Sequence, residues 1–167
     1  SYDAVGTSAP LVLDAGNLIV DAGATITHTV GTTAVVGSIY IDVQTGSVTI
    51  DGTVDAKSKG FAGGGVASDG SGTGKGIYDS GNSGNGGGGG HAGAGGQGNS
   101  AGSTGGGTYG SSTAPVTAGS GGAGGFGANT VGTVGGGIIR INSRGNIAIG
   151  GTIQANTASG LVITTSG

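Results

Sequence analysis

The chain has 167 residues and a mass of 15.1 kDa, and 46 of its residues are glycine. Charged residues make up 8% of it and the formal net charge is −3, so it lacks the basic face that would attract nucleic acid or an anionic membrane. It also lacks an apolar run long enough for membrane insertion, and the absence of cysteine excludes disulfides and thiol chemistry. The length predicts one domain.

Methionine and tryptophan are also absent, and lysine and arginine together number five. Few oxidisable side chains and few trypsin-type cleavage sites suit an extracellular or cell-surface protein. The chain begins at Ser1 without a signal peptide, which suggests a processed mature chain or a fragment.

Short apolar runs with a period of two residues indicate β-strands in the first third of the chain. The stretch from Pro10 to Ile26 holds two such runs, each ended by Asp-Ala-Gly, and Thr25 and Thr27 alternate in the same way. The stretch from Gly37 to Ala56 has the clearest pattern, with Ile39, Ile41 and Val43, then Val48 and Ile50, then Val54. Glycine interrupts every run before a helix could form, so the sequence predicts an all-β protein.

The strand pattern returns after the glycine-rich segment and repeats the earlier one. Placing Gly52 over Gly151 also places Gly46 over Gly145. The same alignment pairs Val48 with Ile147, Ile50 with Ile149, Thr53 with Thr152, Val54 with Ile153 and Ala56 with Ala155. Repeated short strands joined by brief turns favour a short parallel β-helix, a solenoid whose coils stack strand on strand. A β-sandwich is the all-β alternative.

The repeat brackets a segment from Phe61 to Gly137 in which nearly every second residue is glycine. Coils at Ser38–Ala56 and Gly137–Ala155 must be neighbours to bury each other, so the segment between them leaves the solenoid and comes back. It is predicted to be a folded insertion whose legs pack as left-handed polyglycine II helices; a flexible glycine linker is the alternative. The predicted organisation is therefore β-helix coils at 10–60, the insertion at 61–137, and a returning coil with a terminal strand at 138–167.

The glycine runs resemble a known class of extracellular modules. The residues that carry the resemblance are Gly86 to Gly96 around His91, Gly105 to Gly110 around Tyr109, Pro115, Gly119 to Gly122, and the strands that lead to Asn156. They look like the glycine-rich modules of giant bacterial surface and secreted proteins and of filament proteins such as algal mastigonemes. The resemblance covers about Gly37 to Asn156, and it implies a right-handed β-helix that carries a polyglycine II bundle in a structural or adhesive role.

The residues that could carry catalysis have simpler interpretations. His28 and His91 are the possible general bases near neutral pH, but His28 lies among threonines on a predicted strand, and His91 lies in a glycine run with no carboxylate or hydroxyl at a telling spacing. A ring packed or hydrogen-bonded inside the bundle is the favoured role for His91.

Asp14, Asp21 and Asp51 each precede Ala-Gly or Gly, where aspartate caps a turn. Acid catalysis or calcium binding between stacked turns is the less favoured alternative. Gly74-Lys75-Gly76 lacks the following helix and hydroxyl residue of a phosphate-binding loop. The sequence therefore predicts no enzyme and no catalytic, cofactor or metal site.

The leading functional hypothesis is a non-catalytic extracellular structural protein that assembles head to tail into a filament, with itself as partner. Assembly would use stacking between β-helix ends or donation of the strand Leu161–Thr165 to the next subunit. The alternative is an adhesin or phage-type receptor-binding module whose partners are surface glycans; ice binding fits less well because the threonine spacing is irregular. Phe61 and Phe126, near the two ends of the insertion, are expected to anchor it to the solenoid.

Overall fold

The computed structural model describes residues 11–13, 16–33, 36–81, 84–127 and 130–157. These residues form nine β-strands and no helix, so the described part of the protein is all-β, as the sequence predicts. The strands are β1 (Leu11–Leu13), β2 (Leu18–Val20), β3 (Thr25–Thr27), β4 (Ser38–Val43), β5 (Val48–Ile50), β6 (Thr53–Asp55), β7 (Ile138–Ser143), β8 (Ile147–Ile149) and β9 (Thr152–Gln154). The predicted terminal strand Leu161–Thr165 and the turn residue Asp14 lie outside the described residues.

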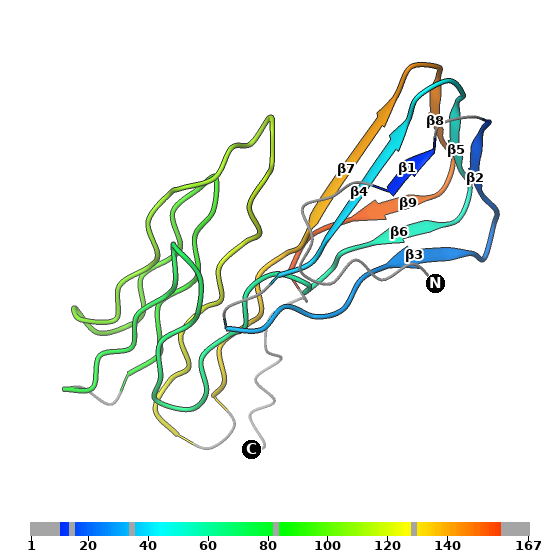
Figure 1. The fold of residues 1–167 in the computed structure, drawn as a ribbon. Coiled ribbons are helices and arrows are strands. Elements are labelled where there is room, and N and C mark those ends of the chain that lie inside the picture. Colours follow the sequence, from blue (N-terminus) through cyan, green and yellow to red (C-terminus); the bar gives the residue numbers. More distant parts are fainter. Residues whose placement is uncertain (1–10, 14–15, 34–35, 82–83, 128–129, 158–167) are drawn as a thin grey trace.

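The strands form three parallel sheets with the orders β1-β4-β7, β2-β5-β8 and β3-β6-β9 (Figure 1). The chain visits the three sheets in turn and does so three times, so each pass adds one strand to every sheet. Purely parallel pairing does not match a β-sandwich, whose sheets are antiparallel. The arrangement is compatible with a solenoid in which each pass lies on the one before.

The internal repeat found in the sequence corresponds to the register of these sheets. Val48 pairs with Ile147 and Ile50 with Ile149 between β5 and β8, and Val54 pairs with Ile153 between β6 and β9. Each turn glycine also meets its counterpart, because the Gly145 amide donates to the Gly46 carbonyl oxygen at 3.0 Å. The paired strands of the second and third passes have equal lengths, and the turns β5–β6 and β8–β9 have equal lengths, so these strands stack in a fixed register. A one-residue slip would move every side chain to the opposite face of its sheet.

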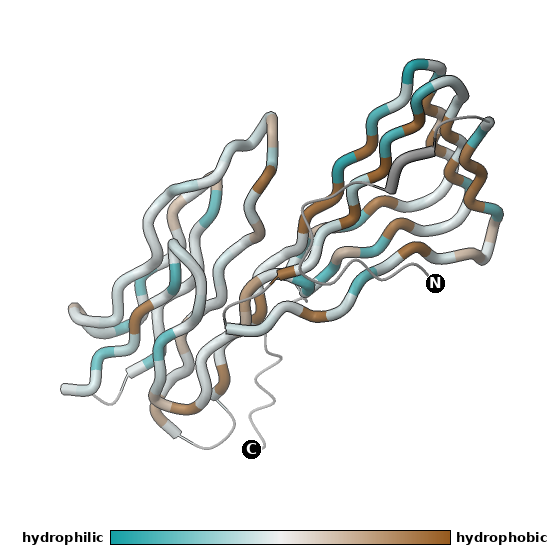
Figure 2. The backbone as a smooth tube through the Cα atoms, viewed as in Figure 1, coloured by the Kyte–Doolittle hydropathy of each residue, from teal (hydrophilic) through white to brown (hydrophobic). Residues whose placement is uncertain are grey.

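The alternation of side chains places the apolar core inside the three sheets. Along β4, residues 39, 41 and 43 are buried and residues 38, 40 and 42 are half-buried. The core cluster consists of Val20, Ile39, Ile41, Val43, Val48, Ile50, Val54 and Ala56. Figure 2 shows the apolar colour concentrated along the strands and scarce in the glycine-rich part. The strand region is therefore held by ordinary hydrophobic burial.

The glycine-rich part is held by backbone hydrogen bonds between extended segments. Residues 120–125 form its buried centre, and their amides donate in turn to three different neighbouring segments. The acceptors of successive amides from residue 120 to residue 125 are the carbonyls of Gly90, Ser71, Thr133, Gly87, Ser68 and Thr130. The direction of donation thus repeats every three residues, with one neighbour at residues 87–90, one at 68–71 and one at 130–133.

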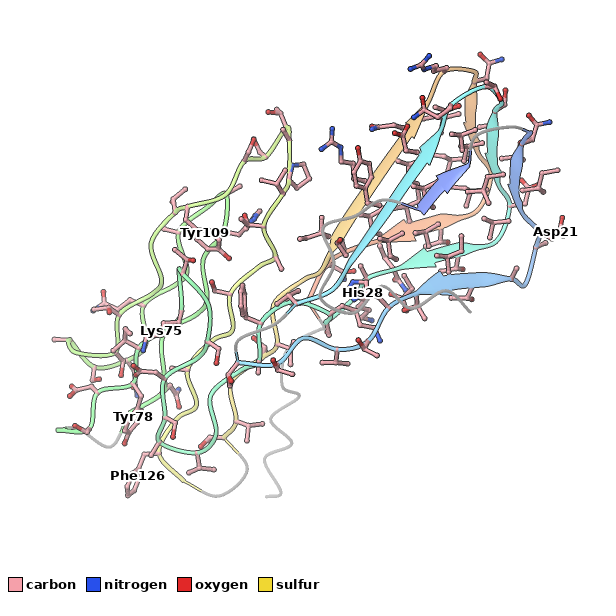
Figure 3. The ribbon with its side chains drawn as sticks, viewed as in Figure 1. Asp21, His28, Lys75, Tyr78, Tyr109 and Phe126 are labelled. Carbon is pink, nitrogen blue, oxygen red and sulfur yellow. The ribbon has the colours of Figure 1, made fainter. Side chains whose placement is uncertain are left out.

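The two phenylalanines of the insertion do not both anchor it to the sheets. Phe61 lies where the chain enters the insertion, and its amide donates to the Gly119 carbonyl oxygen at 3.0 Å. Phe126 is 61% exposed, and Figure 3 places it at the end of the bundle remote from the sheets. The prediction for Phe126 is therefore wrong: proximity to the end of the segment in sequence did not mean proximity to the sheets in space.

Candidate functional site

The histidines and aspartates singled out by the sequence do not converge. His28 directly follows β3, is 2% exposed, and has its Nδ1 2.8 Å from the Thr29 carbonyl oxygen. Asp21 is exposed in the turn after β2, where its carbonyl oxygen accepts the Ala24 amide at 2.9 Å. Figure 3 shows Asp21 and His28 well apart. Asp51 is exposed in the turn after β5.

No group of three or more histidine, cysteine, aspartate or glutamate side chains gathers within the described ranges where it could hold a metal ion. Within the described ranges, the side-chain caps of the turns come from residues other than the predicted Asp21 and Asp51. Asp55 accepts the Lys57 amide at 2.8 Å and Asp79 accepts the Gly81 amide at 3.0 Å.

Lys75, from the Gly74-Lys75-Gly76 sequence, pairs with Asp69 at 2.8 Å. This hydrogen bond, with a second from the Tyr78 amide at 2.9 Å, lowers the pKa of Asp69 below its ordinary value. Because the folded pKa is depressed, the contribution of Asp69 to stability is present above the ordinary aspartate value of about 4 and is lost as the pH falls through the folded pKa. Both side chains are over a third exposed, so the effect on stability should be small.

We therefore expect Lys75→Ala to raise the pKa of Asp69 toward its ordinary value while barely changing the melting temperature at pH 7. An NMR titration of the Asp69 carboxyl carbon in both proteins would measure this. An unchanged Asp69 pKa in the variant would contradict the assigned cause.

His91 holds the base of a projecting arm, residues 110–117. Its ring makes an edge-to-face contact with Tyr109 at 5.1 Å between centroids, and its Nε2 lies 3.0 Å from Thr117 Oγ1. The ring thus contacts the residue just before the arm and a residue at the arm's end. The expectation that His91 packs and hydrogen-bonds within the bundle is confirmed. Within the arm, Ser111 Oγ accepts the Ala114 amide at 3.0 Å, which forms a local turn before Pro115.

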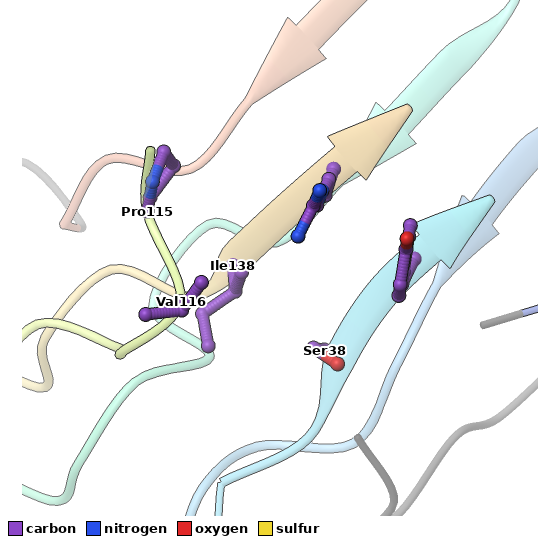
Figure 4. Close-up of a pocket in the computed structure, with 6 residues that line it drawn as sticks. Ser38, Pro115, Val116 and Ile138 are labelled. Carbon is purple, nitrogen blue, oxygen red and sulfur yellow. The ribbon is translucent and has the colours of Figure 1, made fainter. Parts of the chain in front are cut away.

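A groove lies between this arm and the outward side of β4 and β7. It has a volume of ≈250 Å³ and is lined by Ser38, Tyr40, Pro115, Val116, Ile138 and Arg140 (Figure 4). A second cavity of ≈290 Å³ shares Pro115 and Arg140 and is also lined by Thr113, Ala114, Ile139 and Asn142. The two cavities together make one candidate binding site, called here the arm groove.

The floor of the arm groove carries a linked set of polar side chains. Arg140 places its guanidinium carbon 4.8 Å from the centroid of the Tyr40 ring, and Asn142 Nδ2 donates to Tyr40 Oη at 3.2 Å. The register between β4 and β7 aligns Tyr40 with Arg140 and Asp42 with Asn142. Sequence reasoning missed this pair, although extending the internal repeat past its one-residue change in turn length would have aligned Tyr40 with Arg140.

A second candidate surface is the side of the last pass, β7–β9, that faces away from β4–β6; it is called here the open face. Ile147, Ile149 and Ile153 are 44%, 55% and 38% exposed, whereas their register partners Val48, Ile50 and Val54 are at most 1% exposed. The positions are equivalent in the repeat, so the difference comes from the strand neighbour that the described residues do not supply to β8 and β9.

No family model, no curated protein and no solved structure matches this chain. Within the described ranges, no helix has the length and apolar character needed to cross a membrane. The resemblance to glycine-rich extracellular modules therefore stays a prediction.

Proposed function

We propose that the chain is a non-catalytic, extracellular structural protein, built as a short right-handed parallel β-helix with a polyglycine II bundle inserted before its last coil. The order in which the chain visits the three sheets supports the β-helix, because each coil must supply one strand to every face. The register of six matched positions between β4 and β7 supports stacking of full coils.

The hydrogen bonds of residues 120–125 support polyglycine II geometry for the bundle. A polyproline II-type helix has about three residues per turn, so successive amides point about 120° apart and each third amide points to the same neighbour. The observed acceptors repeat in this way among three segments. The central segment has two residues other than glycine, Ser120 and Ala123, which are three positions apart. The amides of both donate to residues 87–90, which fits the same period.

The filament role rests on one observation, the exposed isoleucines of the open face. Among the described residues, β8 and β9 each have one paired edge and an uncovered apolar side, and such a strand is a template for a further parallel strand. Covering the three isoleucines would gain roughly 1 kcal/mol or more for each, because burial of an apolar side chain is favourable in proportion to its area.

The first pass of a second copy fits this open face better than an unrelated surface would. The core columns run Leu18–Val48–Ile147, Val20–Ile50–Ile149 and Ile26–Val54–Ile153. A second copy placed in the same register would continue each column with its own Leu18, Val20 and Ile26, so apolar meets apolar throughout. Such a contact joins two different surfaces and does not close on itself, so it propagates into a filament.

Electron microscopy of the purified chain at several concentrations tests this function, with filaments of regular axial repeat as the expected result. Ile149→Asp places a charge in the open face and should disperse the filaments. Ala148→Asp is the matched control, because it places the same charge on the same strand at an outward position and should leave them intact. Dispersed wild-type particles at every concentration, or filaments that survive Ile149→Asp, would refute stacking through the open face.

Strand donation is distinguished from coil stacking by deleting residues 161–167. If Leu161–Thr165 supplies a strand to the next subunit, the deletion abolishes polymers and leaves a soluble monomer. Polymers that persist exclude donation and leave stacking between coils as the means of assembly.

A further inference from the structure

We propose that the arm groove binds an oligosaccharide that carries carboxylate groups, with Arg140 as the residue that receives the carboxylate. This inference is independent of filament assembly, because the groove lies between the arm and the outward side of β4 and β7 and does not use the exposed isoleucines of the open face.

Arg140 is an exposed cation that is already oriented for an anion. The salt bridge found among the described residues joins Lys75 to Asp69, so no described carboxylate lies within 4.0 Å of the Arg140 guanidinium. The guanidinium carbon lies over the Tyr40 ring, and this cation–π contact holds Arg140 in place while its N–H groups can donate to a carboxylate. The hydrogen bond from Asn142 to Tyr40 Oη fixes the ring in turn, so less side-chain entropy is lost when a ligand binds.

The walls of the arm groove suit a sugar ring. Pro115, Val116 and Ile138 form an apolar wall, and Val116 is 69% exposed. The C–H face of a sugar can pack on such a wall while its hydroxyl groups meet the hydroxyl of Ser38 and the amide of Asn142. Figure 4 shows Val116 and Ile138 next to one another, with Ser38 and Pro115 at other positions around the cavity.

The size of the site favours a short chain over a single sugar. Each cavity is small beside the roughly 300–1,000 Å³ of sites for drug-sized ligands, so each suits about one ring. Pro115 and Arg140 line both cavities, so adjacent rings of one oligosaccharide can occupy them in succession while a carboxylate reaches Arg140.

Other anionic polymers fit the arm groove less well. Nucleic acids bind through several Lys or Arg contacts to phosphates, and this groove offers one cation on a chain with a net charge of −3. Asp42 is on the same outward side of the sheet and accepts a hydrogen bond from Gln44 at 2.7 Å. A carboxylate there accepts hydrogen bonds from sugar hydroxyls.

Titration calorimetry with two matched probes tests the proposal on the full chain: oligogalacturonate, and the neutral galactose oligomer of the same length. We expect saturable binding of oligogalacturonate and at least tenfold weaker binding of the neutral oligomer. Arg140→Ala should weaken binding of oligogalacturonate at least tenfold. Arg144→Ala is the control, because it removes the same charge from the exposed turn after β7, outside the groove, and should leave the affinity within about twofold.

Three outcomes would overturn the proposal. No saturable binding of oligogalacturonate, or equal losses from Arg140→Ala and Arg144→Ala, would mean that the groove is not the site. Competition by acetate as effective as that by the oligosaccharide would mean an anion site with no sugar recognition. A thermal melt of Arg140→Ala that matches wild type shows that the variant is folded, so that a loss of binding can be assigned to the side chain. If Arg140→Ala unfolds, Val116→Asp changes the arm side of the same groove and should abolish binding.

Discussion

Replacing Gly106 by alanine should disrupt the glycine bundle, whereas the same replacement at the adjacent Gly107 should be tolerated. A Cβ on Gly106 would lie 1.8 Å from the Gly74 carbonyl oxygen. That oxygen accepts the Gly90 amide at 2.7 Å, so the backbone at Gly74 cannot move away without breaking this hydrogen bond. A Cβ on Gly107 would meet nothing within 4 Å. We expect Gly106→Ala to cost about 3 kcal/mol or more, at or above the usual cost of overpacking, because the clash is with backbone.

Gly107→Ala is expected to be neutral or to stabilise by up to about 1 kcal/mol, since alanine restricts the unfolded chain. Gly95 and Gly96 provide an independent pair, because a Cβ on Gly95 would lie 2.1 Å from the Gly88 carbonyl oxygen and one on Gly96 would meet nothing within 4 Å. Chemical denaturation and amide hydrogen exchange of the four variants would measure the effect. Equal losses within each pair would contradict the close-packed bundle.

The strand region could be predicted from the sequence because side chains carry its pattern. A period of two residues marks each strand, and glycines at matching positions mark each turn, so aligning Gly52 with Gly151 already gave the register of β5 with β8 and of β6 with β9. The turn before Gly46 is one residue longer than the corresponding turn before Gly145, so the sequence alignment does not extend past it. The Tyr40–Arg140 pair across β4 and β7 was missed for that reason.

The internal arrangement of the bundle could not be predicted, because glycine has no side chain to mark which face a residue presents. Backbone groups alone decide that residues 120–125 lie at the centre with three neighbours, and many glycine runs could in principle supply such neighbours. The arm groove was beyond prediction for the same reason. Its wall at Pro115 and Val116 is brought to β4 and β7 by the path of the bundle, and that path has no signature in the sequence.

Ile50 and Ile149 occupy equivalent positions in successive passes. Truncating Ile50 to alanine should mainly lower the stability of the monomer, whereas truncating Ile149 should mainly weaken assembly. Ile50 is fully buried, so Ile50→Ala removes apolar contacts and leaves a cavity; we expect a loss of about 2–5 kcal/mol and a melting temperature lower by roughly 10 °C in the dispersed monomer. Ile149 is 55% exposed, so Ile149→Ala should cost the monomer less than about 1 kcal/mol.

Ile50→Ala should have the larger effect on monomer stability, whereas Ile149→Ala should have the larger effect on the concentration needed for assembly. If a second copy covers the open face, Ile149 becomes buried in the filament, and Ile149→Ala should raise the concentration needed for assembly about tenfold or more. Thermal melts at a concentration below assembly, followed by sedimentation at higher concentrations, would separate the two effects. A large loss of monomer stability in Ile149→Ala would mean that the chain itself covers this residue, because only burial within one molecule makes the truncation costly in the absence of a partner.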